Sequence, residues 1–219
     1  MNLLFLNPNS TVAMTQAMVA VARATDPEAQ ITGWTNTGGP PAIQGPEDGA
    51  AAVAGLLAML PSAREAGADA IVIGCFDDTG LAQIRATAHC PVIGIGQAAF
   101  HVAALLGHRV SVITTLQVSV PVIAANIAAY GFADQVARVR ASGLGVLEVD
   151  EASPAAIARL DQEILLAGAE DGISAVVLGC AGMAPLVTQL AHGTPMAVID
   201  GVAAATRLAR SLVAQARRI

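Results

Sequence analysis

Two cysteines occupy matching sequence contexts, and a thiol can act as a nucleophile or move protons. Cys75 ends the run Ala-Ile-Val-Ile-Gly-Cys, and Cys180 ends the run Ala-Val-Val-Leu-Gly-Cys. Short apolar runs of this kind predict buried strands, so each cysteine is expected at the carboxyl end of a strand, where open α/β sheets bind ligands. We also expect a helix to begin at or near each cysteine, and its N-terminus would lower the thiol pKa towards neutrality.

Two such thiols facing one cleft from opposite sides would suit racemisation. One thiolate would remove a proton from a stereocentre, and the other thiol would return a proton to the opposite face of the planar carbanion. The alternative is that both cysteines are small core residues, because free cysteine is commonly buried. The Gly-Cys ending that the two runs share favours the catalytic interpretation.

The chain repeats itself beyond the cysteines. A Pro-led apolar run follows each cysteine, at residues 91–95 and 195–199, and residues 4–7 have a counterpart in residues 110–114. The repeat is about a hundred residues long, far longer than a solenoid unit, so it indicates a duplicated domain. We therefore predict an α/β fold of two similar, pseudo-symmetric lobes. Each lobe is a mainly parallel sheet flanked by helices, with the active site in the cleft between them.

Individual elements follow from hydrophobic periodicity and turn residues. Strands are predicted at residues 2–6, 30–34, 68–74 and 109–113. Helices are predicted at 11–24, with Asn9 or Ser10 as N-cap, at 47–66 and from about 202, while residues 36–49, with four Gly and three Pro, predict a loop. The final helix is expected to cross back onto the first lobe. The first lobe would then contain residues 1–96 plus 201–219, and the second lobe residues 97–200.

Composition excludes several classes of protein. All eleven basic residues of the 219 are Arg, so the chain has no Lys for a pyridoxal Schiff base or a Walker-type phosphate loop. No apolar run reaches the roughly 18 residues of a membrane span, and the start lacks the features of a signal peptide, so we expect a cytoplasmic protein. With a net charge of −6 and no basic patch, nucleic acid is not an expected partner.

Five segments together resemble the aspartate/glutamate racemase superfamily, in its hydantoin racemase branch, over essentially the whole chain. They are residues 7–10 (Asn-Pro-Asn-Ser), 39–43, 74–80 (Gly-Cys-Phe-Asp-Asp-Thr-Gly), 178–183 (Leu-Gly-Cys-Ala-Gly-Met) and 198–202. The resemblance implies catalysis by Cys75 and Cys180 without metal, flavin or pyridoxal, and a homo-oligomer acting on a small molecule.

The residues after each cysteine point to a neutral substrate. Amino-acid racemases of the superfamily usually carry an Asn-Thr type sequence after the first cysteine, whereas Phe76, Asp77 and Asp78 stand here. Neither copy offers an obvious cation for an α-carboxylate. We therefore expect a 5-monosubstituted hydantoin, whose ring carbonyls already acidify the hydrogen at C5.

Supporting roles are predicted from position. Asn7, Thr114 and Thr115 at strand ends are expected to bind ring N–H or C=O groups. Backbone N–H groups around Thr79 and Gly182 would bind the ring oxygens as enolate charge develops. The remaining members of the predicted substrate-binding set are Ile43 and Phe76 for the substituent pocket, and Met183. Asn7 could instead be a turn residue, Thr79 a helix-start residue, and Ile43 and Phe76 core residues.

The sequence is compatible with several other functions. Allantoin racemase is the nearest alternative, because allantoin is a hydantoin with a ureido group at C5. An amino-acid racemase, a related decarboxylase or a non-enzymatic small-ligand binding protein are further alternatives.

Cys90 is expected to be structural, and the four His show no metal-ligand spacing. Residues 94–99 resemble a dinucleotide fingerprint but lack its acidic residue further on, and Asp77 and Asp78 are either bases or complements to a helix dipole.

Overall fold

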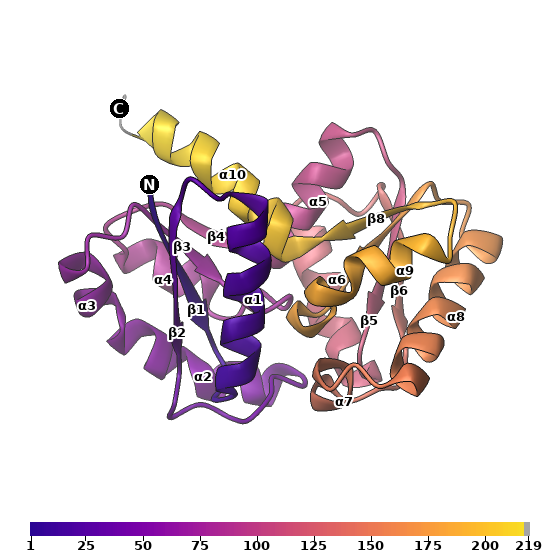
Figure 1. The fold of residues 1–219 in the computed structure, drawn as a ribbon, viewed down its shortest axis with the longest axis horizontal. Coiled ribbons are helices and arrows are strands. Elements are labelled where there is room, and N and C mark those ends of the chain that lie inside the picture. Colours follow the sequence, from indigo (N-terminus) through magenta and orange to yellow (C-terminus); the bar gives the residue numbers. More distant parts are fainter. Residues whose placement is uncertain (217–219) are drawn as a thin grey trace.

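The computed structural model describes residues 1–216 and contains two four-stranded parallel sheets of identical topology. The strand order is β2-β1-β3-β4 in the first sheet and β6-β5-β7-β8 in the second. The strands are β1 (Asn2–Asn7), β2 (Gln30–Thr35), β3 (Ala70–Ile73), β4 (Val92–Gly94), β5 (Val110–Thr114), β6 (Val136–Ala141), β7 (Ala175–Leu178) and β8 (Ala197–Asp200). The repeated order confirms the predicted pair of similar α/β lobes, which lie side by side in Figure 1.

Helices connect the strands in both lobes. The first half contains α1 (Val12–Thr25), α2 (Pro46–Ala58), α3 (Leu60–Glu65), α4 (Leu81–Thr87) and α5 (Ile95–Leu105). The second half contains α6 (Val120–Ala129), α7 (Val146–Asp150), α8 (Pro154–Glu170), α9 (Val187–His192) and α10 (Gly201–Ala216), with 3-10 helices η1 (Gln117–Ser119) and η2 (Ala181–Leu186). None of the helices described is long and apolar enough to cross a membrane.

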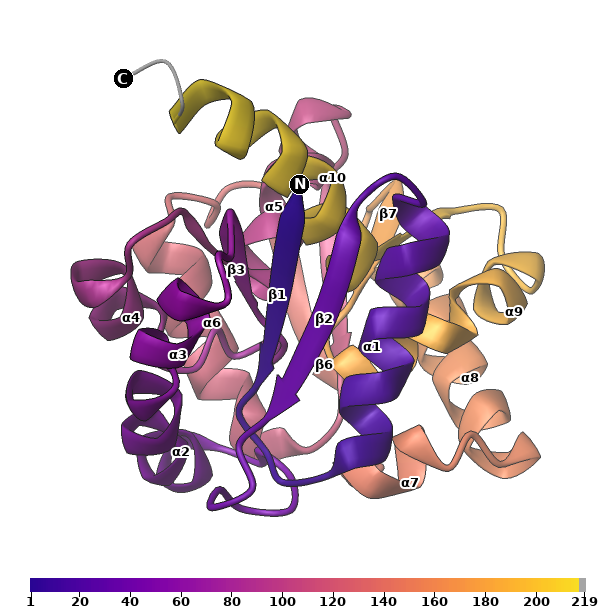
Figure 2. The same ribbon diagram turned by 60° about the vertical axis from the view of Figure 1, so that its left-hand side comes forward.

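Alternating strand residues bury both faces of the first sheet. Leu3 and Phe5 on β1 pack with α1, α5 and α10, while Leu4 and Leu6 pack with α2, α3 and α4. Figure 2 shows α1 on one side of β1 and β2, with α2, α3 and α4 on the other. Side chains on a strand alternate between faces, so a strand covered on both faces is apolar throughout. This explains why the parallel strands read as continuous apolar runs in the sequence.

The second sheet is covered in the same way. Val110 and Val112 on β5 belong to the cluster that contains α5 and α6, and Ile113 belongs to the cluster that contains α7, α8 and η2. Helix α5 follows the first sheet but supplies Phe100 to the core of the second sheet. The two lobes therefore share α5 in their packing.

Helix α10 returns from the second sheet to the first lobe. Its buried residues belong to the same core cluster as those of β1 and α1, and it ends on the side of the molecule where β1 begins (Figure 1). We propose on this basis that the lobes consist of residues 1–96 plus 201–219 and residues 97–200. Residues 217–219 of that division lie outside the described part of the chain.

Three local expectations were wrong. The helix expected at 47–66 is two helices that meet at Met59, because Pro61 has no N–H to continue the hydrogen-bond ladder and is accommodated in the first turn of α3. The loop expected to reach residue 49 ends at Gly45, because α2 begins at Pro46. Thr11, not Asn9 or Ser10, is the N-cap of α1, and Asn9 Oδ1 accepts a hydrogen bond from the Thr11 N–H at 2.9 Å.

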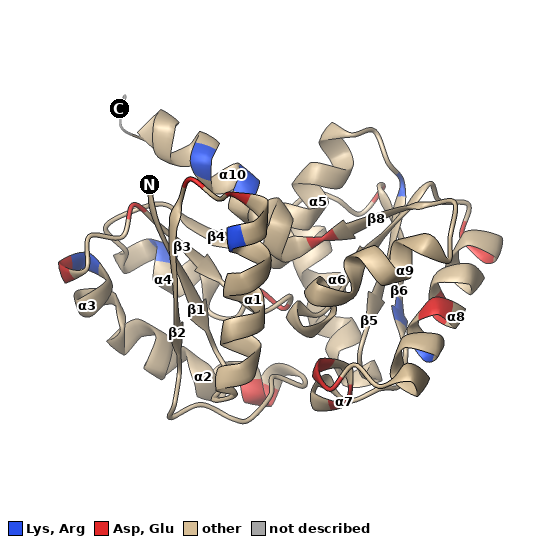
Figure 3. Ribbon diagram, viewed as in Figure 1, with Lys and Arg blue, Asp and Glu red and all other residues tan. Residues whose placement is uncertain are grey.

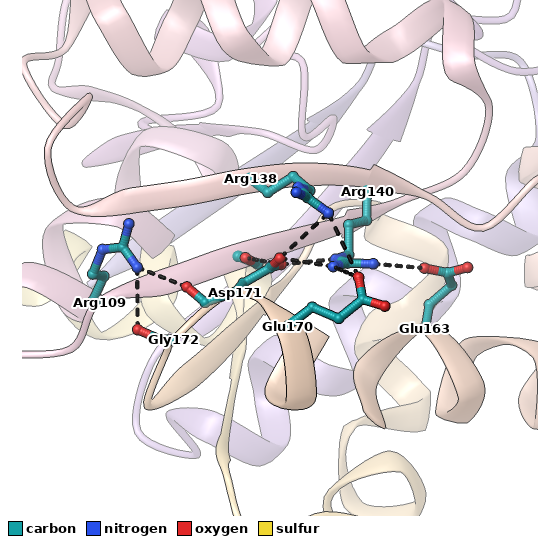
Figure 4. Close-up of polar contacts among 8 residues, drawn as sticks. Arg109, Arg138, Arg140, Glu163, Glu170, Asp171 and Gly172 are labelled. Carbon is teal, nitrogen blue, oxygen red and sulfur yellow. Dashed lines mark hydrogen bonds and ion pairs between the residues drawn. The ribbon is translucent and has the colours of Figure 1, made fainter. Parts of the chain in front are cut away.

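Charged side chains are spread thinly over both lobes (Figure 3), with one dense network between β6 and the end of α8 (Figure 4). The buried guanidinium of Arg140 donates to Asp171 at 2.7 Å through two nitrogens and to Glu170 at 2.6 Å. Asp171 also accepts a hydrogen bond from Ser111 on β5. The network therefore joins an edge strand, its neighbour and a helix end within the second lobe.

Candidate functional site

One small cavity between the lobes contains both cysteines of the repeated motif. Its wall is made by Asn9, Met14, Ile43, Gly74, Cys75, Phe76, Asp77, Thr114, Thr115, Ser119, Val146, Gly179, Cys180 and Ala181. These residues come from the segments that follow β1, β3, β5 and β7 and from the facing loops and helices of both lobes. The cavity encloses about 30 Å³, room for roughly one or two water molecules.

Strand register brings the two thiols to equivalent positions. Ile73 on β3 pairs with Leu6 on β1, and Leu178 on β7 pairs with Ile113 on β5. Each cysteine lies two residues beyond its paired position, at the carboxyl edge of its sheet. Because parallel strands end at a common edge, the duplicated sheets present the two cysteines to the same cavity.

The glycine before each cysteine is closely packed. A Cβ at Gly74 would lie 2.6 Å from the Met18 sulfur, and one at Gly179 would lie 2.7 Å from Val112 Cγ1 and 2.9 Å from the Ile113 carbonyl oxygen. At Gly179 the close neighbour is backbone, so only glycine fits, whereas at Gly74 the flexible end of the Met18 side chain can give way. The shared Gly-Cys dipeptide therefore has a packing cause at the glycine.

The thiols are held as neutral groups in the cavity. Burial raises the pKa of Cys75 well above its usual range, and the Asp77 carboxylate adds to that effect. Burial also raises the pKa of Cys180 to about 12. The expectation of a pKa near neutrality was wrong because burial outweighs the local donors. No α-helix begins at either cysteine to oppose it: α4 starts only at Leu81, and Cys180 is followed by the 3-10 helix η2.

Short-range donors act against that burial at both sulfurs. The Asp77 N–H and the Thr79 hydroxyl lower the pKa of Cys75, and the N–H groups of Gly182 and Met183 lower the pKa of Cys180. In both lobes the N–H two residues after the cysteine is directed at its sulfur. Of the backbone N–H groups expected to bind ring oxygens, that of Gly182 acts on the Cys180 sulfur in this structure. Among the described residues, the Thr79 hydroxyl is one of two buried polar side-chain groups that make no hydrogen bond of normal geometry.

A carboxyl group lies on the cavity wall beside both thiols. Burial, with the neighbouring Asp78, raises the pKa of Asp77 to about 7. The charge of Asp77 raises the pKa of Cys75 and of Cys180, so it is close enough to influence both. The cavity therefore contains three groups that can gain or lose a proton.

The neighbouring Asp78 has a different role. Its carboxylate accepts hydrogen bonds from the N–H groups of Gly96 and Gln97 at 2.9 and 2.8 Å and from the Tyr130 hydroxyl at 2.9 Å. Burial nevertheless raises the pKa of Asp78 to about 6. It complements the dipole of α5 rather than of the following α4. Its carboxylate occupies the position that a pyrophosphate would take in a dinucleotide fingerprint at residues 94–99.

The predicted substrate-binding residues divide into two groups. Ile43, Phe76, Thr114 and Thr115 line the cavity with the two cysteines. Phe76 also packs edge-on against Phe100 at 5.7 Å between ring centroids, so it belongs to the core as well.

The other predicted residues lie outside the cavity wall. Asn7 is fully buried and donates hydrogen bonds to Asn9, Thr11 and Thr15, which is the turn role considered for it. The Met183 side chain is buried in the core of the second lobe. Thr79 lines a neighbouring groove, and Gly182 does not line the cavity.

Sequence reasoning missed several residues of the wall. They are Asn9, Met14, Ser119, Val146 and Ala181, whereas Asp77 was already considered as a possible base. Asn9 and Ala181 belong to motifs that were recognised, so proximity to Asn7 and Cys180 was a usable signal. Met14 and Val146 carry no such signal, because they are apolar residues of α1 and α7 that tertiary packing brings to the site.

The four His residues and Cys90 make ordinary structural contacts. Each of the four His has a hydrogen bond to a nearby backbone carbonyl or hydroxyl. Cys90 is half-buried against the core of the first lobe. Among residues 1–216, no three His, Cys, Asp or Glu side chains are grouped as a metal site would need.

Known proteins resemble this chain over nearly its full length. The family described as Asp/Glu/Hydantoin racemase matches residues 3–209. A hydantoin racemase from Rhizobium meliloti is 43% identical over 214 residues, which are 97% of this chain and 89% of the relative. The structure of an allantoin racemase from Klebsiella pneumoniae is 38% identical with a TM-score of 0.93, covering 99% of this chain and 89% of that one.

A second solved structure agrees with the first. The allantoin racemase from Pseudomonas fluorescens is 33% identical with a TM-score of 0.90, covering 99% of this chain and 92% of that one. A glutamate racemase from Francisella tularensis, at 16% identity and a TM-score of 0.72, shares the fold. Together with the extent of the family match, these similarities show that the protein belongs to the Asp/Glu/hydantoin racemase family and is a racemase.

Proposed function

We propose that the protein interconverts the D- and L-forms of 5-monosubstituted hydantoins by proton transfer between C5 and the thiols of Cys75 and Cys180. The observation that carries this proposal is the presence of both thiols on the wall of one cavity, each supplied by one of two similar lobes. Two-base racemisation needs an acid and a base on opposite sides of one carbon. The sequence similarity to hydantoin racemases supports the same conclusion.

The polarity of the wall supports a neutral ring as substrate. Within the described chain, the residues that line the cavity include no Arg, and the sequence has no Lys, so an α-carboxylate would find no cation there. Asp77 would repel a carboxylate. Asn9, Thr114, Thr115 and Ser119 offer amide and hydroxyl groups that suit the N–H and C=O groups of a hydantoin.

The proton transfer follows from the ring's own acidity. A thiolate takes the C5 proton, and the electron pair moves into the adjacent ring carbonyl as an enolate. The second thiol then donates its proton to the opposite face of C5. In the reverse direction the two thiols exchange roles, so the same pair serves both enantiomers. This route asks nothing of a cofactor.

Allantoin is the second candidate substrate. Two solved allantoin racemases match this chain at TM-scores of 0.93 and 0.90. The same thiol pair would act at C5 of allantoin, and only the surroundings of the substituent would differ. Rates on both substrates decide between them.

The test is loss of optical rotation in deuterated buffer. Enantiopure 5-benzylhydantoin or allantoin is incubated with the protein, with Cys75→Ala and with Cys180→Ala, against an enzyme-free blank. We expect racemisation with deuterium at C5 in the wild type and its loss in both variants. Each variant should still exchange deuterium into the enantiomer served by its remaining thiol. Cys90→Ala is the matched control and should racemise normally.

Other results would redirect the proposal. Activity on neither hydantoin, with normal folding, would refute it and favour amino-acid substrates. Retained ligand affinity in a double Cys variant, without any turnover by the wild type, would indicate a binding protein.

We also propose that the protein self-associates. Leu105 on α5 and Leu212 on α10 are exposed and line one hollow of about 300 Å³ with Leu208 and Ala98. Apolar surface of this kind favours association. Light scattering after size exclusion gives the subunit number directly, and a monomer across the accessible concentration range would contradict the proposal.

A further inference from the structure

Asp77 belongs to two cavities at once. It lines the small cavity that holds the thiols, and it also lines a larger groove of about 480 Å³ whose wall comes from α2, α4 and α6 and the loop before α4. Cys75, Asp77 and Cys180 are the titratable residues that line the small cavity, and of these three Asp77 also lines the groove. A proton on its carboxyl group can therefore reach either thiol on one side and the groove on the other.

The carboxylate of Asp77 is not committed to another partner among the described residues. No hydrogen bond or ion pair to its side chain is present there, in contrast to Asp78 with its three donors. The charged and titratable groups around it are Cys75, Cys180 and Asp78, with Arg85 and Tyr130 on the far wall of the groove.

A two-thiol racemase must restore its starting state after each turnover. When Cys75 has taken a proton and Cys180 has given one, the thiolate is on Cys180, and the enzyme is set for the opposite enantiomer. Before it can convert the first enantiomer again, one proton must move from the Cys75 sulfur to the Cys180 sulfur. With the facing segments placed as in this structure, the cavity has room for only one or two water molecules, so a side chain on its wall can carry the proton without the segments moving apart.

We propose that Asp77 is a relay residue that carries this proton between the two thiols. The inference rests on the proposed function. The Asp77 carboxylic acid first protonates the Cys180 thiolate, so that an O–H bond breaks and an S–H bond forms. The Cys75 thiol then gives its proton to the Asp77 carboxylate, so that an S–H bond breaks and an O–H bond forms. One proton has moved, the total charge of the three groups is unchanged, and no electron is transferred.

The electrostatics of the site agree with this sequence. The intermediate has two neutral thiols and one carboxylate, which is the arrangement favoured by raised thiol pKa values and an Asp77 pKa of about 7. When Asp77 takes a proton, its repulsion of the nearby thiolate disappears. The three groups therefore share a single negative charge and titrate as a unit.

The first test compares the kinetics of Asp77→Asn with those of the wild type on whichever hydantoin is turned over. Removing a proton carrier should lower kcat by roughly 100-fold in both directions, with little change in KM. In the wild type, kcat should rise with pH through about 7, as the three groups together lose one proton and gain the single negative charge that the relay moves. In the variant that limb should disappear. Asp77→Glu should restore part of the rate, which an effect on folding alone would not predict.

Asp150→Asn is the matched control. The Asp150 charge also raises the pKa of Cys180, but Asp150 does not line the cavity. Its kcat should stay within about twofold of the wild type. A kcat for Asp77→Asn equal to or above that of the wild type near neutral pH would overturn the relay.

The second test follows the thiols directly by the ultraviolet absorbance of thiolate, in a Cys90→Ala background. Asp77→Asn should move the thiolate titration to lower pH, because a repelling charge has been removed. An unchanged titration overturns the relay whether or not the protein racemises hydantoins. A shifted titration in a protein that racemises neither hydantoin overturns the proposed function and the relay with it.

Discussion

The two thiols, Cys75 and Cys180, lie where burial and local donors act in opposite directions. Burial keeps both neutral, while one or two N–H groups beside each sulfur favour the thiolate. A thiolate stabilised outright by the site would have little tendency to take a proton from carbon. This balance between burial and local donors indicates that each thiol ionises during turnover rather than in the resting protein.

Asp77→Asn should make the folded protein more stable above neutral pH. Burial raises the pKa of Asp77 from 3.8 to about 7, so the folded protein binds its proton more tightly than the unfolded chain does. Its contribution to stability is therefore greatest below about pH 4 and is lost as pH rises to about 7. At pH about 8 we expect the variant to gain roughly 1–3 kcal/mol in the free energy of unfolding.

Urea unfolding of Asp77→Asn and of the wild type at several pH values measures this gain in the free energy of unfolding. The gain should shrink towards zero at about pH 4, where Asp77 is protonated in both states. Asp134→Asn, at an exposed position before β6, is the control and should show no such pH dependence. A variant less stable than the wild type at high pH would contradict the expectation and would mean that the Asp77 carboxylate is stabilised in the folded state.

At the scale of elements, one junction holds the edge of the second sheet. Arg140 on β6, Ser111 on β5 and Asp171 after α8 are joined by short hydrogen bonds (Figure 4). The side chains of Arg140 and Asp171 are only 9% and 2% exposed, so each needs the other to compensate for lost hydration. The junction ties the edge strand to the helix that covers it.

Asp171→Asn should therefore destabilise the fold by roughly 2–3 kcal/mol, because a charged hydrogen bond is lost while Arg140 stays buried. The hydrogen bond from Arg140, helped by Ser111 and Arg138, lowers the pKa of Asp171. The stabilisation is then fully present above about pH 4 and disappears as pH falls through the lower, folded pKa.

Thermal or urea unfolding across this pH range measures the difference between Asp171→Asn and the wild type. Arg138→Gln is the comparison, since the Arg138 side chain is 57% exposed and its loss should cost less than about 1 kcal/mol. Equal effects of the two substitutions would show that burial does not strengthen this pair.

In the molecule as a whole, the two lobes touch each other beside the cavity. A hydrogen bond of 2.9 Å joins the Val146 N–H at the start of α7 to the Gln44 side chain of the opposite lobe. The cavity of about 30 Å³ is well below the roughly 300 Å³ of ordinary ligand pockets. A hydantoin can enter only if the facing segments move apart.

Gln44→Ala should make that opening easier. Losing one hydrogen bond of about 1 kcal/mol should raise the population of the open form about fivefold. Alkylation of Cys75 by iodoacetamide, followed by mass spectrometry of the labelled peptide, should accelerate by a similar factor. Cys90 lies outside the cavity wall and is the internal control. An unchanged rate at Cys75 would mean that other contacts limit opening.

The two-lobe α/β fold, the strands and the matched pair of cysteines could be predicted from the amino-acid sequence. These features follow from short-range patterns, namely continuous apolar runs, glycine and proline positions, and a repeat. The same reasoning did not foresee the break at Met59, where a single Pro61 ends one helix and begins another.

The environment of the site depends on tertiary packing and could not be predicted in this way. Burial by residues distant in the chain, such as Met14 and Val146, reversed the expected direction of the thiol pKa values. Asp77 and Asp78 are adjacent in sequence, yet one faces the thiols and the other caps α5. Solvation and electrostatics depend on what surrounds a group in space, and local sequence does not contain that information.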